Sequence, residues 1–177
     1  PTEGSVFSDY EVLKNHWIIE YSEEGCGRYL IAEPDPVTFR IRQELDLQTS
    51  IHDAHLDPLP GFDRETIRMQ ISTPASPTEV TEIDLRSGKS RQLKISVPPN
   101  GHDSTNYIVK RHYGVSGDGQ LVPLTIVHHK NVVPNHGSPV LLTGYGAYGM
   151  SLTPRFSATR RILLTRGVIH VTAHVRG

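Results

Sequence analysis

The first hundred residues alternate between short strand-like runs and clusters of turn-forming residues, and this alternation constrains the fold more than any other feature. Turn clusters such as EEGCG, EPDP, DPLPG, TPASP and RSGK separate the runs. Regularly spaced short strands are typical of a sandwich, a barrel or propeller blades, and no helix-length amphipathic pattern appears before about residue 150. The predicted strands are His16–Tyr21, Arg28–Ala32, Phe39–Leu45, Thr66–Ser72, Glu79–Leu85 and Arg91–Val97.

A different pattern begins after the break at Pro98-Pro99-Asn100-Gly101. The runs YIVKRHYGV and QLVPLTIVHHK flank an Asp118-Gly119 turn and predict a hairpin. Val140–Thr143 then predicts a buried strand, which the glycine-rich stretch GYGAYG follows. This half of the chain therefore departs from the simple strand–turn alternation of the first half.

A helix is predicted in TPRFSATRRILLTRG, with Thr153 as N-cap, Pro154 as its first residue and Gly167 as its stop signal. The run VIHVTAHV predicts a final strand, which completes a βαβ unit whose two strands should be parallel. Apolar residues occur on both faces of this last strand, and such strands are normally covered on both sides. We therefore expect the chain to be a piece of a longer protein, interrupted inside an α/β domain.

The stretch Gly144–Gly149 has the spacing G-x-G-x-x-G, which is also found in dinucleotide-binding turns. Two features argue against a nucleotide. Met150–Gly177 contains no acidic residue for a ribose, although Arg176 could serve a 2′-phosphate, and the side chains of Tyr145 and Tyr148 would crowd a pyrophosphate. No cofactor is therefore expected.

A second interpretation of the glycine stretch comes from α/β-hydrolases. In these enzymes an antiparallel pair precedes the third strand, and the loop between that strand and the first helix supplies an oxyanion-hole donor. The glycine stretch lies at the corresponding place, and Tyr145 can present a phenolic donor. A tight βα turn with packed tyrosines is the purely structural alternative.

The segment VLLTGYGAYGMSLTPRFSATRRILLTRGVIHVTAHVRG resembles the start of the catalytic domain of the prolyl oligopeptidase family of serine peptidases. The combination of GYGAYG with AHVRG is most similar to the oligopeptidase B (protease II) branch. ISTPASPTEVTEIDLRSGKSRQL resembles the last propeller blade of that branch, and GDGQLVPLTIVHHK resembles the re-entry into the hydrolase domain. The resemblance covers nearly the whole chain and is strongest after about residue 105.

This resemblance implies a mixed fold, with the end of an all-β seven-bladed β-propeller over residues 1–100 and the start of an α/β-hydrolase domain over residues 101–177. It implies a serine-type endopeptidase that cleaves short peptides through an acyl-enzyme. Tyr145 matches the family tyrosine whose hydroxyl joins the oxyanion hole, and Tyr148 matches an aromatic wall of the substrate pocket. The sequence contains no G-x-S-x-G, and Ser138 precedes a strand, so the nucleophile, acid and base are expected outside these residues.

Two alternatives to the peptidase remain open: a non-hydrolytic interaction protein with the same two folds, or an esterase. The net charge of −1 gives no reason to expect nucleic acid or a membrane as partner, and the only cysteine, Cys26, is compatible with a cytoplasmic location. His52 and His55 have the spacing of metal ligands but are expected as solvated residues of a polar loop, so no metal is predicted. His170 and His174 should share one face of the last strand, where packing or hydrogen bonding is favoured over metal binding.

Overall fold

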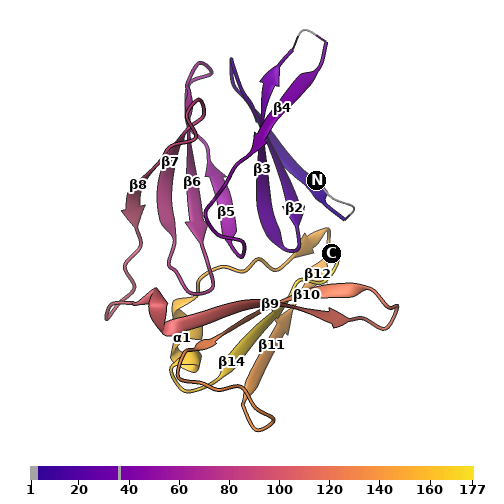
Figure 1. Cartoon of the computed structure of the whole chain (residues 1–177), viewed down its shortest axis with the longest axis vertical. Coiled ribbons are helices and arrows are strands. Elements are labelled where there is room, and N and C mark those ends of the chain that lie inside the picture. Colours follow the sequence, from indigo (N-terminus) through magenta and orange to yellow (C-terminus); the bar gives the residue numbers. More distant parts are fainter. Residues whose placement is uncertain (1–3, 36) are drawn as a thin grey trace. The chain divides into compact units, whose positions relative to one another are not determined.

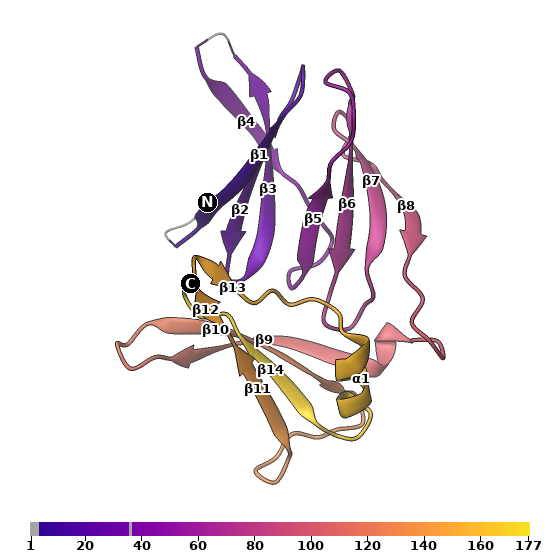
Figure 2. The same ribbon diagram turned by 180° about the vertical axis from the view of Figure 1, so that it is seen from behind.

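The computed structural model describes residues 4–35 and 37–177, and the chain divides into two compact units. One unit consists of residues 1–71 and 78–95, and the other of residues 72–77 and 96–177. Figures 1 and 2 show the strands of the first unit in indigo to magenta and those of the second in pink to yellow. No helix of the described ranges is long and apolar enough to cross a membrane.

The first unit is built from two four-stranded sheets in which each strand pairs with the next one along the chain. The pairs from β1 to β4 and from β6 to β8 are antiparallel. The first sheet contains β1 (Val6–Val12), β2 (Trp17–Glu23), β3 (Cys26–Pro34) and β4 (Phe39–Glu44), and the second contains β5 (Asp53–Asp57), β6 (Thr66–Ser72), β7 (Glu79–Asp84) and β8 (Ser90–Ile95). All six predicted strands are present, within a few residues of their expected limits.

Alternation of side chains explains why these segments form strands with one buried face. In β6, Ile67, Met69 and Ile71 are 0%, 0% and 7% exposed, whereas Arg68 and Gln70 between them lie closer to solvent. Successive side chains of a strand point to opposite faces, so this period of two directs every apolar residue of β6 to the same side.

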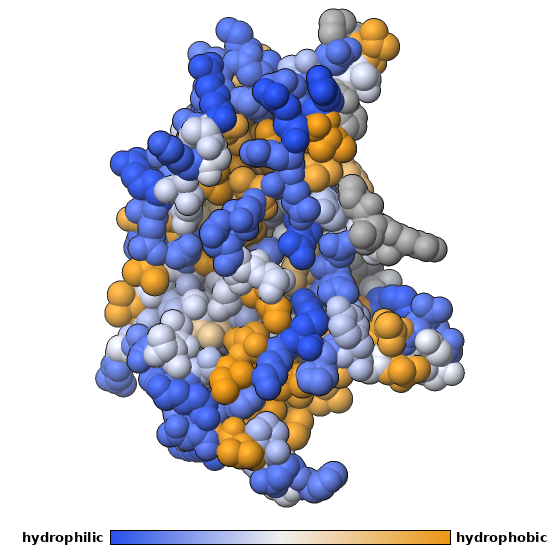
Figure 3. All heavy atoms as spheres, in the orientation of Figure 1, coloured by the Kyte–Doolittle hydropathy of each residue, from blue (hydrophilic) through white to orange (hydrophobic). Residues whose placement is uncertain are grey.

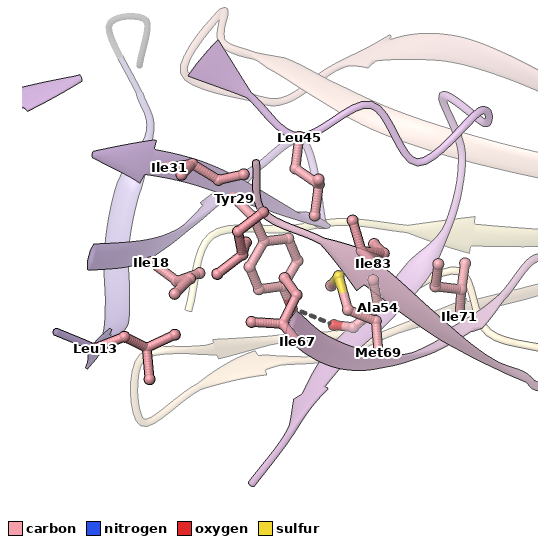
Figure 4. Packing of buried hydrophobic residues seen from close by; sticks show 11 residues of the cluster. Leu13, Ile18, Tyr29, Ile31, Leu45, Ala54, Ile67, Met69, Ile71 and Ile83 are labelled. Atoms are coloured by element: carbon pink, nitrogen blue, oxygen red, sulfur yellow. Dashed lines mark hydrogen bonds between the residues drawn. The ribbon is translucent and has the colours of Figure 1, made fainter. Parts of the chain in front are cut away.

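The buried faces of the two sheets form the main apolar core of the first unit (Figure 4). Tyr29 of β3 lies at its centre, is 0% exposed, and donates a hydrogen bond of 2.8 Å from its hydroxyl to the backbone oxygen of Ala54 in β5. This bond gives the buried hydroxyl an acceptor within the core. The core residues are Leu13, Ile18, Tyr29, Ile31, Leu45, Ala54, Ile67, Met69, Ile71, Ile83 and Leu85.

Two strands of the first unit, β1 and β5, were not predicted. The prediction that His52 lies in a solvated polar loop is also wrong. Residues 53–57 form β5, and His52 is only 1% exposed. Its Nδ1 lies 2.8 Å from the backbone oxygen of Thr49 and its Nε2 lies 2.8 Å from that of Gly27. Hydrogen bonding to the backbone, which hydrophobicity patterns do not report, therefore brings this polar segment into the sheet.

The second unit contains a mixed four-stranded sheet in the order β11-β14-β10-β9. The predicted hairpin of β9 and β10 is antiparallel, β10 and β14 are antiparallel, and β11 and β14 are parallel, as predicted for the βαβ unit. Figure 2 shows α1 beside one end of this sheet. The elements are η1 (Ser104–Asn106), β9 (Tyr107–Val115), β10 (Leu121–His129), β11 (Val140–Gly144), β12 (Gly146–Ala147), β13 (Met150–Ser151), α1 (Ala158–Leu164) and β14 (Ile169–Ala173).

The helix begins later than the sequence predicts. Ser157, not Thr153, is the N-cap, and its side chain accepts a hydrogen bond from the backbone N–H of Arg160 at 3.2 Å. Pro154 is not the first helical residue but is buried in the preceding irregular segment, so its burial takes precedence over its preference for a helix start. The predicted end of the helix at Gly167 is confirmed, because this glycine follows the helix with a φ of 85°.

Two basic residues of α1 donate hydrogen bonds to backbone oxygens. Arg161 donates from Nη2 to the backbone oxygen of Pro99 at 3.0 Å and from Nη1 to that of Gly101. Arg160 is half-buried and donates to the backbone oxygen of Arg155 at 2.9 Å. The helix therefore holds the proline-rich segment that precedes β9.

The core bond of Tyr29 gives a stability prediction. Tyr29→Phe keeps the ring but leaves the backbone oxygen of Ala54 buried without its donor, so we expect the free energy of unfolding to fall by about 1–3 kcal/mol. Urea denaturation measures the change. Tyr10→Phe is the matched control, because Tyr10 is 61% exposed. Equal urea midpoints for Tyr29→Phe and Tyr10→Phe would mean that the hydrogen bond to Ala54 does not stabilise the fold.

Candidate functional site

The glycine stretch folds as a very short β-hairpin directly after β11. In this hairpin Gly146 pairs with Ser151 and Ala147 pairs with Met150, which leaves Tyr148 and Gly149 as the two turn residues. Their φ angles are 57° and 72°. Two successive left-handed residues are the requirement of a type I′ turn, the form that suits a two-residue hairpin.

Tyr148 is the unusual member of this turn. A non-glycine residue with a positive φ is uncommon, and residues in sparsely populated backbone regions cost of order 1–3 kcal/mol each. The ring is 94% exposed, so burial of the side chain does not offset this cost. Backbone strain that is not offset by burial of the same residue's side chain occurs preferentially at functional positions.

Gly146 is required because another segment approaches it closely. A Cβ atom placed there would overlap the backbone oxygen of Arg176 and would lie 2.6 Å from Cγ2 of Val175. Figures 1 and 2 both place the C-terminal end of the described chain beside β12. The space above this glycine is therefore filled by protein backbone and is not open to a pyrophosphate, which argues further against the dinucleotide interpretation.

The two tyrosines of the hairpin differ in exposure. Tyr145 connects β11 to β12 and is 43% exposed, whereas Tyr148 lies at the tip of the turn. Both side chains can therefore reach a molecule from solvent. Tyr145 directly precedes the first strand of the hairpin, and Tyr148, three positions further along, lies in its turn.

A row of polar residues crosses all four strands of the second unit's sheet. Thr143 of β11 is opposite Thr172 of β14, Thr172 is opposite Thr125 of β10, and Thr125 is opposite Arg111 of β9. Thr125 and Thr172 are 1% and 4% exposed. The sequence did not identify this row, because its members become neighbours only once the register of all four strands is known.

Of the predicted pair, His170 lies on the face of β14 that carries Thr172, and His174 directly follows the strand. His170 is 4% exposed, and its Nε2 lies 3.2 Å from Oγ1 of Thr143. Burial, with a smaller contribution from Arg160, lowers the pKa of His170 from 6.5 to about 4. The ring is therefore neutral at physiological pH.

His174 is 6% exposed and uses both ring nitrogens. Nε2 lies 2.7 Å from Oγ1 of Thr125, and Nδ1 lies 2.6 Å from the backbone oxygen of Leu152. The expected hydrogen bonding of His174 is therefore present, and its partners belong to β10 and to the segment after β13.

The remaining polar candidates do not assemble into a site. Ser138 accepts a hydrogen bond from the backbone N–H of Asn135 at 3.0 Å within a turn. His55, whose side chain is 65% exposed, lies 3.2 Å from Oδ1 of Asp53. Within residues 4–35 and 37–177, no group of three or more His, Cys, Asp or Glu residues is arranged to hold a metal ion.

Apolar side chains also reach the surface of the second unit (Figure 3). Val140, Leu141 and Leu142 of β11 are 57%, 40% and 63% exposed. Neighbouring residues of a strand point to opposite faces, so both faces of this edge strand carry exposed apolar groups. The hairpin therefore follows a strand with apolar surface on both of its sides.

Comparison with known proteins relates the chain to peptidases. The chain is 34% identical over 129 residues to dipeptidyl aminopeptidase BI of Pseudoxanthomonas mexicana, a match that covers 72% of the chain and 18% of the relative. It is 26% identical over 175 residues to protease 2 of Moraxella lacunata, with 90% of the chain and 25% of the relative covered. No family model matches the chain.

Among solved structures, the chain is similar to oligopeptidase B from Trypanosoma brucei with covalently bound antipain, with a TM-score of 0.87 and 25% identity. This match covers 99% of the chain and 26% of the solved chain. The chain thus spans between 18% and 26% of the length of these three proteins. The mostly β architecture of the described residues, with its one α-helix, agrees with the structure of this oligopeptidase B.

The lowered pKa of His170 gives a pH prediction. Between pH 6.5 and pH 4 the unfolded chain binds a proton at this ring but the folded chain does not, so the free energy of unfolding falls as the pH falls through this window. His170→Gln removes the titrating ring. We expect the unsubstituted protein to lose up to about 3 kcal/mol more than this variant between pH 7 and pH 4.

Urea denaturation at a series of pH values measures this difference. His136→Gln is the control, because His136 is exposed. We expect the pH profile of the control to match that of the unsubstituted protein. A His170→Gln profile that is parallel to both would contradict the prediction.

Proposed function

We propose that this chain, which belongs to the prolyl oligopeptidase family and is of the oligopeptidase B type, forms part of a serine oligopeptidase that hydrolyses peptide bonds in short peptides. The observation that carries the proposal is the strained hairpin with Tyr145 at the carboxyl end of β11. In α/β sheets, ligands bind in the crevice outside the carboxyl ends of the strands. We assign the protein to the cytoplasm, where its single buried cysteine would stay reduced.

We assign residues 1–100 to the end of a β-propeller and residues 101–177 to the start of an α/β-hydrolase domain. The two four-stranded sheets of β1 to β8 support the first assignment, because propeller blades are four-stranded sheets. The order of the antiparallel pair β9 and β10, then β11, a loop, α1 and β14 supports the second.

In the proposed reaction a serine hydroxyl attacks the peptide carbonyl carbon, and the carbonyl oxygen takes up negative charge. The amine then leaves, and water hydrolyses the acyl-enzyme. The hydroxyl of Tyr145 donates a hydrogen bond to the oxygen as the charge develops, which lowers the energy of the transition state. The covalently bound antipain of the Trypanosoma brucei relative supports a covalent mechanism. We place the serine, its base and the orienting carboxylate outside residues 1–177, because these residues contain no G-x-S-x-G.

Tyr148 has a different role in the proposal. Its ring projects from the tip of the hairpin and offers an aromatic face to the side chain of a bound peptide. This contact would form in the ground state as well as in the transition state, so it would govern KM more than kcat.

The nucleophile can be located with a fluorophosphonate probe. We expect the whole protein to be labelled at a serine outside residues 1–177, and the isolated chain to stay unlabelled. Peptide mapping by mass spectrometry identifies the modified residue. Labelling of any serine within this chain, or a whole protein that stays unlabelled while folded, would contradict the proposal. An enzyme that is labelled but cleaves only esters would support the esterase alternative.

The role of Tyr145 can be measured directly. Tyr145→Phe keeps the ring and removes only the donor, so we expect kcat on a peptide amide to fall by roughly 10²–10³-fold, with little change in KM. Tyr148→Phe is the matched variant in the same hairpin, and its effect should be mild. Tyr148→Ala should raise KM. Full kcat in Tyr145→Phe together with inactivity of Tyr148→Phe would mean that the two roles are wrongly assigned.

A further inference from the structure

The segment of residues 144–151, which contains the hairpin, is attached at both ends by side chains of β14 and of the residue that follows it. Thr143 directly precedes this segment, as a residue of β11, and Leu152 directly follows it. His170 contacts the first of these residues and His174 contacts the second. His170 lies in β14, and His174, four positions further along, directly follows this strand.

The attachment at Thr143 is made inside the protein. Oγ1 of Thr143 lies 3.2 Å from Nε2 of His170 and 3.4 Å from the backbone oxygen of Val171. The backbone oxygen of Val171 can only accept a hydrogen bond, and the hydroxyl of Thr143 has only one proton to donate. If the hydroxyl donates to Val171, then Nε2 of His170 donates to the hydroxyl. The residue before the hairpin is therefore bonded to two successive residues of β14.

The attachment at Leu152 belongs to a longer chain of hydrogen bonds. The backbone oxygen of Leu152 can only accept, so Nδ1 of His174 donates to it. Oγ1 of Thr125 accepts from Nη1 of Arg111 at 3.0 Å and can donate its own proton to Nε2 of His174. With its proton on Nδ1, His174 thus links Arg111 and Thr125 to the residue after the hairpin.

These bonds lie in a buried setting where they are hard to replace. Thr125, His170 and His174 are 1%, 4% and 6% exposed. A buried hydrogen-bonding atom that loses its partner costs about 1–3 kcal/mol, whereas an exposed one finds water. The hairpin ends are consequently held more firmly than the exposed turn between them.

We propose that His170 and His174 are positioning residues that fix the two ends of the glycine hairpin and thereby the place of the Tyr145 hydroxyl. They do not touch the substrate in this proposal and act only through the hairpin. The inference rests on the proposed function, since the position of Tyr145 matters for catalysis only if its hydroxyl donates to the reacting oxygen. The holding of the hairpin itself does not depend on that function.

The experiment uses pairs of amide variants in the whole protein. Asparagine can present a donor at the place of Nδ1 and glutamine at the place of Nε2. At position 174, His174→Asn therefore retains the bond to Leu152, and His174→Gln loses it. At position 170 the order is reversed: His170→Gln retains the bond to Thr143, and His170→Asn loses it. Each pair compares two side chains of the same chemistry at one buried position, which separates the bond from a general loss of packing.

Two quantities are measured for each variant: backbone amide hydrogen exchange of residues 144–151 and the kinetics of peptide hydrolysis. In His174→Gln and His170→Asn we expect exchange of the hairpin amides to rise at least about tenfold. We expect kcat to fall by about 10–100-fold with KM nearly unchanged, because a small displacement of a catalytic group lowers the rate strongly. His174→Asn and His170→Gln should stay close to the unsubstituted protein in both measurements.

The two proposals can fail separately. Unchanged exchange in His174→Gln and His170→Asn would overturn the positioning role, as would equal effects of the two amides at each position. If exchange rises as expected but Tyr145→Phe keeps full kcat, positioning stands and the proposed function of Tyr145 fails. If both stand, adding His174→Gln to Tyr145→Phe should reduce kcat much less than it does alone, since both changes remove the same interaction.

Discussion

The position of β14 between β10 and β11 is the constraint on which the second unit depends. A strand with a neighbour on each side has both rows of backbone groups paired, and its side chains are flanked by those of two other strands. Ile169 on one face is buried, as is Leu164 of the helix, whereas His170 and Thr172 on the other face are buried with polar neighbours. Buried polar groups need partners, and the strands on either side supply them through Thr125 and Thr143.

The same arrangement determines where the hairpin lies. Parallel strands need a crossover connection, so the chain between β11 and β14 must leave the sheet at the carboxyl end of β11 and return to the start of β14. The hairpin and α1 are the two parts of this connection. The hairpin comes first and stays at the carboxyl edge, where α/β folds bind their ligands, while α1 makes the return. The placement of the hairpin is therefore a consequence of strand direction.

The sequence predicts strands well where apolar residues alternate, as in β6, and it predicts the parallel unit from the order of its elements. It fails where hydrogen bonds replace apolar burial. The strand at residues 53–57 was predicted as a polar loop. Its neighbour His52 is buried through contacts to two backbone oxygens, which a hydrophobicity pattern does not report. The helix start is misplaced because the burial of Pro154 cannot be seen from its neighbours in the sequence. Tyr145 is predicted from the order of the elements and from family resemblance, whereas the row from Arg111 to Thr143 depends on a register that no local pattern contains.

The attachment of both hairpin ends to β14 has a consequence for how this loop can vary. His170 and His174 lie four positions apart, a separation that spans roughly 13 Å in extended chain. The loop between Thr143 and Leu152 must bridge the corresponding span and also close through a two-residue turn. An inserted or deleted residue would leave the anchors in place and force the turn to change its type, which would redirect both tyrosines. The length of this loop is accordingly determined by the strand beneath it, so relatives that keep both anchors should vary the identity of its residues and not their number.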